Sequence, residues 1–333
     1  MLRRAFLALP AAAAAQTAAK KSAAEKGSAV KTAARAGLGA KERVNRALRG
    51  AETDRPPFTF WYHFGLEKYP FERHVNATLE FHRKFRTDLV KVMSDYAYPK
   101  PKGKWYELKV EGNPFPEQIK ALEAIHDGLA GRAHFVETIF NSWTVAEKLS
   151  SKEEVLRMKD ENPRRLLAAL EMIAESQTHH ARKAVEAGAS GIFLAVANAQ
   201  EGVLSRADYA KFSEPFDRLI LKAVDYAPLN TLHLHGEKVY MDLFYSDWPV
   251  AAINYSAHAT GVGIGELRQR FSGLIMAGID EVKYRTLADA VLKKQWQAAQ
   301  EAAGKRFLLS PGCSVPNETT DEEMLRLTKT IRA

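Results

Sequence analysis

Residues 187–236 decide the fold, and they read AGASGIFLAVANAQEGVLSRADYAKFSEPFDRLILKAVDYAPLNTLHLHG. Residues 191–196 form a short run rich in β-branched and aromatic side chains, and residues 230–236 form another. Between them, residues 206–226 repeat their apolar side chains with the period of a helix. The order strand, helix, strand predicts two parallel strands joined by a crossover helix.

The same alternation extends along the rest of the chain. Eight runs have strand character, and they are residues 58–64, 89–94, 134–140, 191–196, 230–236, 250–256, 273–279 and 306–309. Helical stretches separate them, the clearest being residues 152–187, 206–226, 287–303 and 321–331. Eight strands in about 280 residues predict an α/β protein with a closed (β/α)₈ barrel, in one domain over residues 41–333.

The composition limits the classes of function. The chain has 333 residues, of which 46% are hydrophobic and 26% charged, as expected for a folded globular protein. Its single cysteine, Cys313, excludes an internal disulfide and any cluster of cysteines that would bind zinc or iron and sulfur. Neither a dinucleotide-binding Gly-x-Gly-x-x-Gly after the first run nor a phosphate-binding P-loop occurs in the sequence.

The positive charge lies in an N-terminal arm. Residues 1–50 carry eleven Lys and Arg against two Glu, so the net charge of +8 leaves the other residues at −1. Nucleic-acid binding by the body is therefore not expected. Residues 1–19 resemble a twin-arginine export signal with an apolar core too short to span a membrane, and residues 20–40 are typical of a flexible linker. The sequence predicts export to the periplasm. The alternative is a cytoplasmic protein whose N-terminal leader carries no targeting signal.

A candidate metal site lies at the predicted carboxyl ends of two strands. His233 and His235 are two apart in a strand, so their imidazoles point to the same side. Cys313 follows the last strand and lies at the same end of a barrel, where active sites are found. Two histidines and one thiolate leave a fourth position open on a tetrahedral zinc ion. The alternative is a hydrogen-bonded histidine pair that supports the barrel or a bound anion.

Other polar side chains follow the predicted strands. Asp95 and Asp280 each end an apolar run, and in a barrel mouth either carboxylate would orient a substrate, act as a base or supply a metal ligand. His63 and Tyr255 are lesser candidates for catalysis and for lining the pocket. The alternative role for each is to cap a loop.

Six short stretches, taken in order, resemble the uroporphyrinogen decarboxylase superfamily. They are residues 41–50 (KERVNRALRG), 54–56 (DRP), 88–95 (DLVKVMSD), 233–236 (HLHG), 278–280 (GID) and 310–316 (SPGCSVP) with Thr319. The resemblance covers residues 41–333 and independently implies the (β/α)₈ barrel.

True decarboxylases of this superfamily carry Met-Arg-Gln-Ala-Gly-Arg after the first strand, and its arginines hold the substrate's carboxylates. Residues 62–68 read YHFGLEK at the corresponding place, so the first arginine is missing. Lys68 lacks the planar fork with which the second arginine grips a carboxylate. Asp95 matches the aspartate that binds pyrrole N–H groups in those enzymes. The resemblance therefore speaks against decarboxylation of a tetrapyrrole.

The other branch of the superfamily contains the methylcobalamin:coenzyme M methyltransferases and related corrinoid enzymes, which bind zinc through His-x-Cys and a late cysteine. His233 and Cys313 match two of these ligands, and His235 stands where the family has a thiolate. The resemblance implies one zinc ion held by these three residues. With one anionic ligand fewer, the zinc ion would be a stronger Lewis acid.

Three hypotheses follow from the sequence. The leading one is a zinc-dependent enzyme that transfers a methyl group to or from a corrinoid, a corrinoid protein or a small nucleophile. The second is decarboxylation, without a cofactor, of uroporphyrinogen or a related polycarboxylate in porphyrin biosynthesis. The third is an exported protein that binds a tetrapyrrole without catalysis.

Overall fold

The computed structural model describes residues 37–66, 68–93 and 96–332. The predicted export segment, the predicted linker as far as residue 36, and the candidate Asp95 lie outside the described residues. The first described helix, α2, begins at Ala40 and ends at Arg49.

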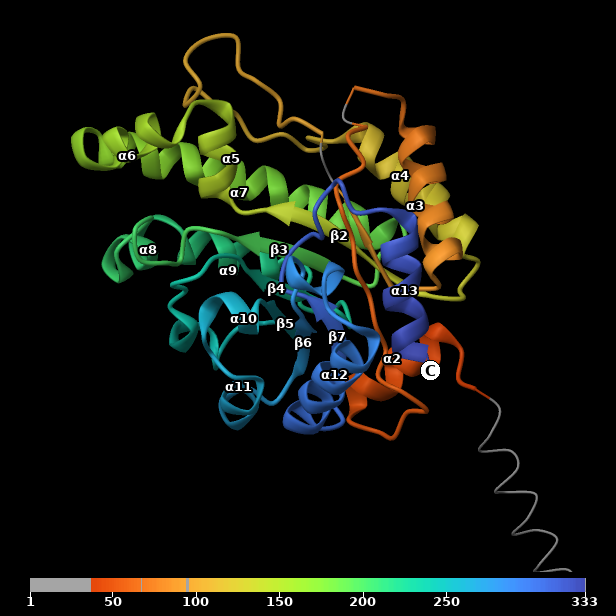
Figure 1. Cartoon of the computed structure of the whole chain (residues 1–333). Helices are drawn as coiled ribbons and strands as arrows, with labels where there is room; N and C mark the ends of the chain where they lie inside the picture. The colour runs from red at the N-terminus through yellow and green to blue at the C-terminus, as the bar shows by residue number, and fades with distance from the viewer. Residues whose placement is uncertain (1–36, 67, 94–95, 333) are drawn as a thin grey trace, which may run out of the picture. The chain divides into compact units, whose positions relative to one another are not determined.

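The architecture is α/β, with one curled sheet of seven parallel strands (Figure 1). The strands are β1 (Leu89–Val92), β2 (His134–Phe140), β3 (Ile192–Val196), β4 (Thr231–Leu234), β5 (Ala252–Tyr255), β6 (Leu274–Ile279) and β7 (Phe307–Pro311). They are ordered β1 to β7 across the sheet, so each strand pairs in parallel with the next one in the chain. A sheet wound in one direction in this way has the topology of a barrel.

The first of the eight predicted strands, residues 58–64, is reduced to a short extended segment. Phe58 forms a parallel bridge with Leu309 of β7, and Thr59 donates its backbone N–H to Leu309 O over 3.0 Å. On the other side, the N–H of Asp88, the residue before β1, donates to Phe58 O over 2.8 Å. The segment therefore contacts both edges of the seven-stranded sheet.

The prediction of a full strand there was wrong because side chains take the backbone hydrogen bonds. The N–H of Phe58 donates to the Asp88 carboxylate over 3.0 Å, and that of His63 donates to Asn317 Oδ1 over 3.2 Å. A donor used in this way is not available to a neighbouring strand, so the pairing of the segment with β7 is limited to the bridge at Phe58.

Helices cover the outer face of the sheet. Besides α2, they are α3 (Phe71–Phe85), α4 (Pro116–Leu129), α5 (Ser142–Leu149), α6 (Lys152–Glu161), α7 (Pro163–Glu186), α8 (Arg206–Phe212), α9 (Glu214–Lys222), α10 (Ala257–Thr260), α11 (Ile264–Arg270), α12 (Asp289–Ala303), α13 (Asp321–Arg332) and the short 3₁₀ helices η1 (Met241–Phe244) and η2 (Lys283–Arg285). None of the helices described combines the length and apolarity that crossing a membrane requires.

Two predicted long helices, residues 152–187 and 206–226, are each divided in two. Pro163 begins α7 directly after α6, and Pro215 lies in the first turn of α9. Proline has no N–H to donate, and it disfavours a helical conformation in the residue before it. Each predicted long helix is therefore interrupted near its proline, where a second helix begins.

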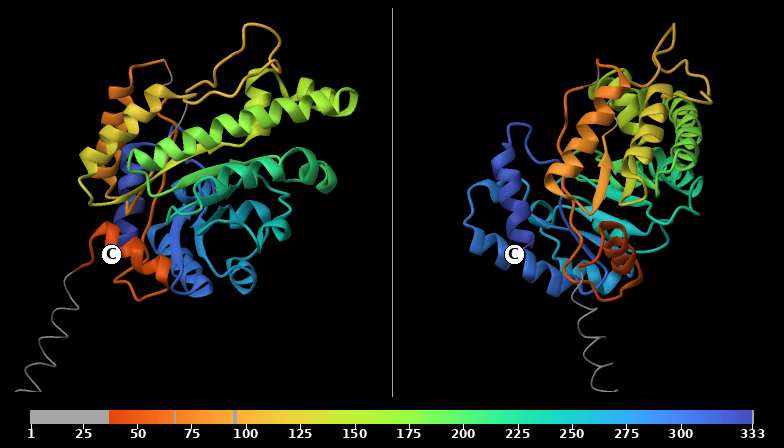
Figure 2. Two further views of the ribbon diagram at one scale, coloured as in Figure 1. Left: turned by 180° about the vertical axis from the view of Figure 1, so that it is seen from behind. Right: turned by 90° about the vertical axis from the view of Figure 1, so that its right-hand side faces the viewer.

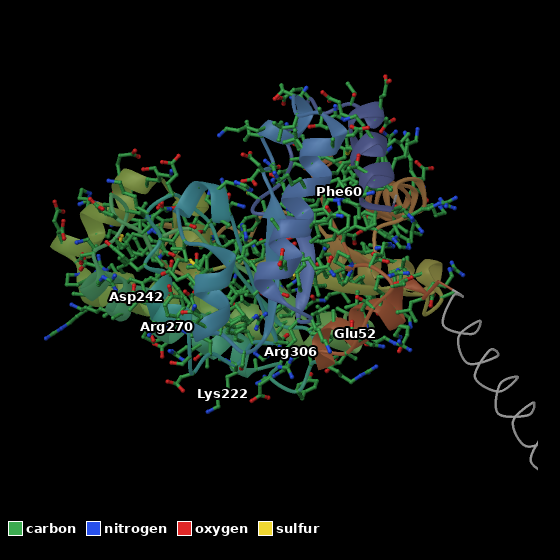
Figure 3. The ribbon with its side chains drawn as sticks, turned by 60° about the horizontal axis from the view of Figure 1, so that its bottom comes forward. Glu52, Phe60, Lys222, Asp242, Arg270 and Arg306 are labelled. Carbon is green, nitrogen blue, oxygen red and sulfur yellow. The ribbon has the colours of Figure 1, made fainter. Side chains whose placement is uncertain are left out.

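The amino ends of the strands are closed by α2. Val44 and Ala47 of this helix join the buried cluster that fills the inside of the sheet, together with Leu89, Phe193 and Leu308. Figure 2 shows α2, near the start of the coloured chain, beside the strands. Figure 3 labels charged side chains at this end, with Glu52 just after α2 and Arg306 just before β7. The opposite ends, where the strands finish, are not covered by α2, and a binding site is expected there.

Candidate metal centre

The alternation of side chains along β4 directs His233 toward the inside of the sheet. Leu232 and Leu234 belong to the cluster that packs against the helices. His233, between them, points the other way, and its ring stacks on Phe193 of the inner cluster with 5.0 Å between centroids. His235 lies one residue past the end of β4, and its ring centroid is 5.9 Å from that of His233.

The structure brings Cys313 to these two histidines. The cysteine follows β7, which ends at Pro311. One nitrogen of each imidazole and the Sγ of Cys313 all lie within 4.8 Å of one another. His233 is buried, Cys313 is half-buried and His235 is exposed, so the cluster opens from the core toward solvent. The convergence predicted from the sequence is present.

Asn254 of β5 fixes the orientation of His233. Its Oδ1 lies 2.6 Å from His233 Nδ1, while its Nδ2 donates to the carbonyl oxygens of Met276 and Pro311 at 3.0 and 2.9 Å. Because the amide nitrogen is already used as a donor, Oδ1 must accept, and His233 must carry its proton on Nδ1. His233 Nε2 is thereby the nitrogen left to face the cluster and would be the atom that binds a metal, as in metal sites where the second nitrogen donates to a protein oxygen.

The electrostatics favour a thiolate at Cys313. Burial acts to raise the pKa of the thiol, but hydrogen bonds and charge from His233 and His235 outweigh it and lower the pKa to about 4. The hydrogen bond with Cys313 in turn raises the pKa of His235 against its partial burial, aided by the charges of Cys313 and Glu281. A thiolate is the form of cysteine that binds metals.

A cavity of about 210 Å³ adjoins the three side chains. Trp61, Phe140 and Phe193 line it, and so does the predicted candidate His63. Lys91 of β1 also enters it, with its Nζ 5.2 Å from the Trp61 ring centroid and 4.8 Å from that of Phe193. The cavity therefore combines aromatic walls with a positive charge.

Sequence reasoning missed Lys91 and did not select Asn254 as a site residue. Lys91 alternates with Val90 and Val92 in a strand, a period that places it on the inward face with Leu89. That pattern was a usable signal for Lys91. In the sequence, Asn254 is one polar residue within a buried strand. Its role in orienting His233 follows from the parallel pairing of β4 and β5, which places the two residues side by side.

Asp280 and Tyr255 are not brought to the cavity. Asp280 accepts hydrogen bonds at Oδ1 from the N–H groups of Val282 and Lys283, at 3.2 and 2.9 Å, and so caps its own turn. Tyr255 is fully buried in the cluster beneath the helices, and its hydroxyl donates to Val262 O over 3.2 Å. The neighbour of Asp280, Glu281, accepts from the N–H of Gly312 over 3.1 Å, next to Cys313.

The donor set fits a zinc ion. Ligands on tetrahedral zinc lie about 3.5 Å apart, given bonds of about 2.0–2.3 Å, and the three donor atoms lie within 4.8 Å of one another. Two imidazoles, one of them oriented by Asn254, and a thiolate of low pKa are ligands that zinc prefers. Among the described residues, the cluster offers three protein ligands, which suits a catalytic ion with one position for substrate.

Two solved structures share the fold at low sequence identity. One is described as a methyltransferase from Methanosarcina mazei, with a TM-score of 0.73, 17% identity, and coverage of 89% of this chain and 98% of that one. Another is described as a B12-independent methionine synthase from Shewanella sp. W3-18-1, with a TM-score of 0.53, 10% identity, and coverage of 84% and 92%. At such identities the likeness establishes the fold.

A comparison with curated proteins found no match. The family model described as uroporphyrinogen decarboxylase (URO-D) matches residues 102–333, which is more than half of the chain. Together with the barrel-like sheet, this match identifies the chain as a member of the uroporphyrinogen decarboxylase (URO-D) family.

Proposed function

We propose that this chain is a zinc-dependent methyltransferase in which His233, His235 and Cys313 hold the metal. The observation that carries the proposal is the convergence of two imidazoles and a thiol of low pKa beside a cavity. The descriptions of the two similar structures, a methyltransferase and a methionine synthase, support methyl transfer as the reaction class. Bound zinc would supply a Lewis acid that lowers the pKa of a coordinated thiol.

The protein's own residues prepare the site for this reaction. Asn254 holds His233 in one tautomer, and Phe193 packs against its ring. Trp61 and Phe140 line the cavity with apolar surface that displaces water from the reacting atoms. Lys91 places a cation in the cavity that favours an anionic substrate.

The methyl transfer is a nucleophilic substitution at carbon. A small thiol loses its proton to solvent, and its sulfur forms a bond to the methyl carbon. The bond between that carbon and the donor breaks, and the electron pair stays with the donor. If a methylated corrinoid is the donor, cobalt(III) becomes cobalt(I). His235 replaces a second thiolate, so the metal ligands carry one negative charge and favour ionisation of the substrate thiol.

An assay of methyl transfer tests this function. Zinc-loaded protein is incubated with methylcobalamin and small thiols, and mass spectrometry follows the methyl thioether while absorbance follows the corrinoid. We expect product with the wild type and with Tyr255→Phe, whose hydroxyl points away from the cavity, and none with Cys313→Ala. Absence of thioether, with conversion of uroporphyrinogen to coproporphyrinogen in a parallel incubation, would instead establish decarboxylation.

The compartment of the reaction rests on the N-terminal arm. Arg3 and Arg4 predict export, in which case the methyl donor and acceptor must also lie outside the cytoplasm. Determining the N-terminal residue of the protein isolated from its own cells tests this prediction. A mature chain that begins after residue 19 supports export, whereas an intact arm on a cytoplasmic protein contradicts it.

A further inference from the structure

A second cavity, of about 180 Å³, lies next to the metal cavity. We call it the α7 cavity, because Gln177 and His180 of α7 line it together with residues of β2 and the loop before α4. Thr138 and Phe140 of β2 line both cavities. Only the side chains of these shared residues therefore separate a ligand in the α7 cavity from the metal cavity.

Aromatic rings shape the α7 cavity. Phe115 meets Tyr98 edge-on with centroids 5.9 Å apart, and it meets the His180 ring edge-on at 4.9 Å. Phe140 forms another wall, with Lys148 Nζ 3.3 Å from its ring centroid. An apolar cavity of about 150 Å³ holds benzene. The size and the walls thus suit a ligand with one planar ring.

His180 brings an unsatisfied polar atom to this cavity. The side chain is only 1% exposed, and its Nε2 donates to Glu137 Oε1 over 2.9 Å. Glu137 is held in turn by Gln118, whose Nε2 donates to its other oxygen over 2.8 Å. Within the described part of the chain, His180 Nδ1 has no hydrogen-bond partner. A buried polar atom without a partner is unfavourable, so a ligand group that pairs with it is favoured.

The charges of the α7 cavity favour an anion. Lys100 and Lys148 line it, and no Asp or Glu is among the described residues that do so. Glu137 accepts from His180 Nε2, so His180 Nδ1 faces a ligand as the acceptor of the ring. The two ammonium groups match the acceptors of a carboxylate.

We propose that the α7 cavity binds an aromatic carboxylate with a single ring, and that this group is the part of the substrate that positions the reacting end beside the metal. The reaction that follows binding rests on the proposed methyl transfer, but the binding itself does not. Phe115 and Phe140 hold the ring, while Lys100 and Lys148 hold the carboxylate.

Calorimetric titration with benzoate tests the proposal on the whole protein, with benzamide as the uncharged probe of the same shape. We expect benzoate to bind at least tenfold more tightly than benzamide. Lys148→Gln, a change at an exposed side chain, is expected to weaken benzoate about tenfold, whereas Lys120→Gln on α4 leaves it unchanged. Equal affinity for benzoate and benzamide, no binding of either, or no effect of Lys148→Gln overturns the proposal.

A second variant separates this inference from the proposed function. Cys313→Ala removes a metal ligand but leaves the α7 cavity intact, so we expect it to bind benzoate like the wild type. If methyl transfer fails while Cys313→Ala still binds benzoate, the α7 cavity stands and the reaction is reassigned. If the wild type transfers methyl groups but does not bind benzoate, only the α7 cavity is refuted.

Discussion

Two histidines of the sheet are almost equally buried but differ in what their nitrogens meet. His134 begins β2 and is 7% exposed, and His233 lies in β4 and is 6% exposed. Each has an asparagine Oδ1 beside one nitrogen, from Asn45 at 2.7 Å and from Asn254 at 2.6 Å. The second nitrogen of His134 lies 2.6 Å from Ser190 Oγ, whereas that of His233 is directed to the cluster with His235 and Cys313.

The difference shows that burial alone does not distinguish a structural histidine from a ligand. Both nitrogens of His134 are saturated by protein groups, so this ring can only support the fold. His233 is held through one nitrogen and presents the other to a thiol. This difference supports a structural role for His134 with Asn45, and the proposed metal-binding role for His233 with Asn254.

The largest predicted effect concerns the acid sensitivity caused by His134. Burial, with a smaller contribution from the charge of Lys41, lowers the pKa of His134 to about 4. Because the folded-state pKa lies below the ordinary value of 6.5, the stabilisation is present above pH 6.5 and is lost as the pH falls toward 4. We expect this residue to contribute roughly 3 kcal/mol to the loss of stability between pH 7 and 4.

Urea denaturation at several pH values measures this effect. His134→Gln keeps hydrogen-bonding groups but cannot titrate, so its free energy of unfolding is expected to fall less steeply with acid than that of the wild type. Parallel curves for the two proteins would show that His134 does not carry the acid sensitivity.

The next largest effect is on zinc affinity and concerns the two asparagines that contact these histidines, Asn254 and Asn45. Loss of the group that orients a metal-binding histidine weakens metal binding about 10- to 100-fold. Asn254→Ala is therefore expected to raise the zinc dissociation constant by that factor, measured by competition with a chromophoric chelator. Asn45→Ala makes the same change beside His134 and is expected to leave zinc affinity as it is. Equal losses in both variants would mean that the effect is general destabilisation.

The smallest effect concerns Tyr255, which follows Asn254 in β5 but faces the helices. Tyr255→Phe removes the hydrogen bond to Val262 O and is expected to cost about 1 kcal/mol of stability. Zinc affinity should not change, because the hydroxyl does not reach the cavity. A loss of zinc in Tyr255→Phe, measured with the same chelator, would contradict this orientation of β5.

The sequence predicted those parts of the site that depend on local periodicity. The spacing of His233 and His235 placed both rings on one face of a strand, and Cys313 after the last strand placed the thiol at the same end. Tyr255 was chosen where Asn254 is the inward residue, because β5 is buried on both faces and its composition does not reveal which side chains point inward. Asp280 capped its own turn, which is a common competing use of an aspartate after a strand.

The fold was predicted from the sequence to a similar extent. Seven of the eight strand runs form the parallel sheet, because each is an apolar run bounded by turn signals. The first run has the same composition, but hydrogen bonds from its backbone to the distant side chains of Asp88 and Asn317 leave it with only a short bridge to β7. Such long-range partners are not encoded in a local pattern.

The metal content of the purified protein tests the central claim most directly. Wild type, His233→Ala, Cys313→Ala and the control His134→Gln are grown with zinc, purified without chelators and analysed by mass spectrometry for bound metal. We expect about one zinc ion per chain in the wild type and in His134→Gln, and almost none in the other two. A wild type without bound zinc, or a Cys313→Ala protein that retains it, would contradict the account.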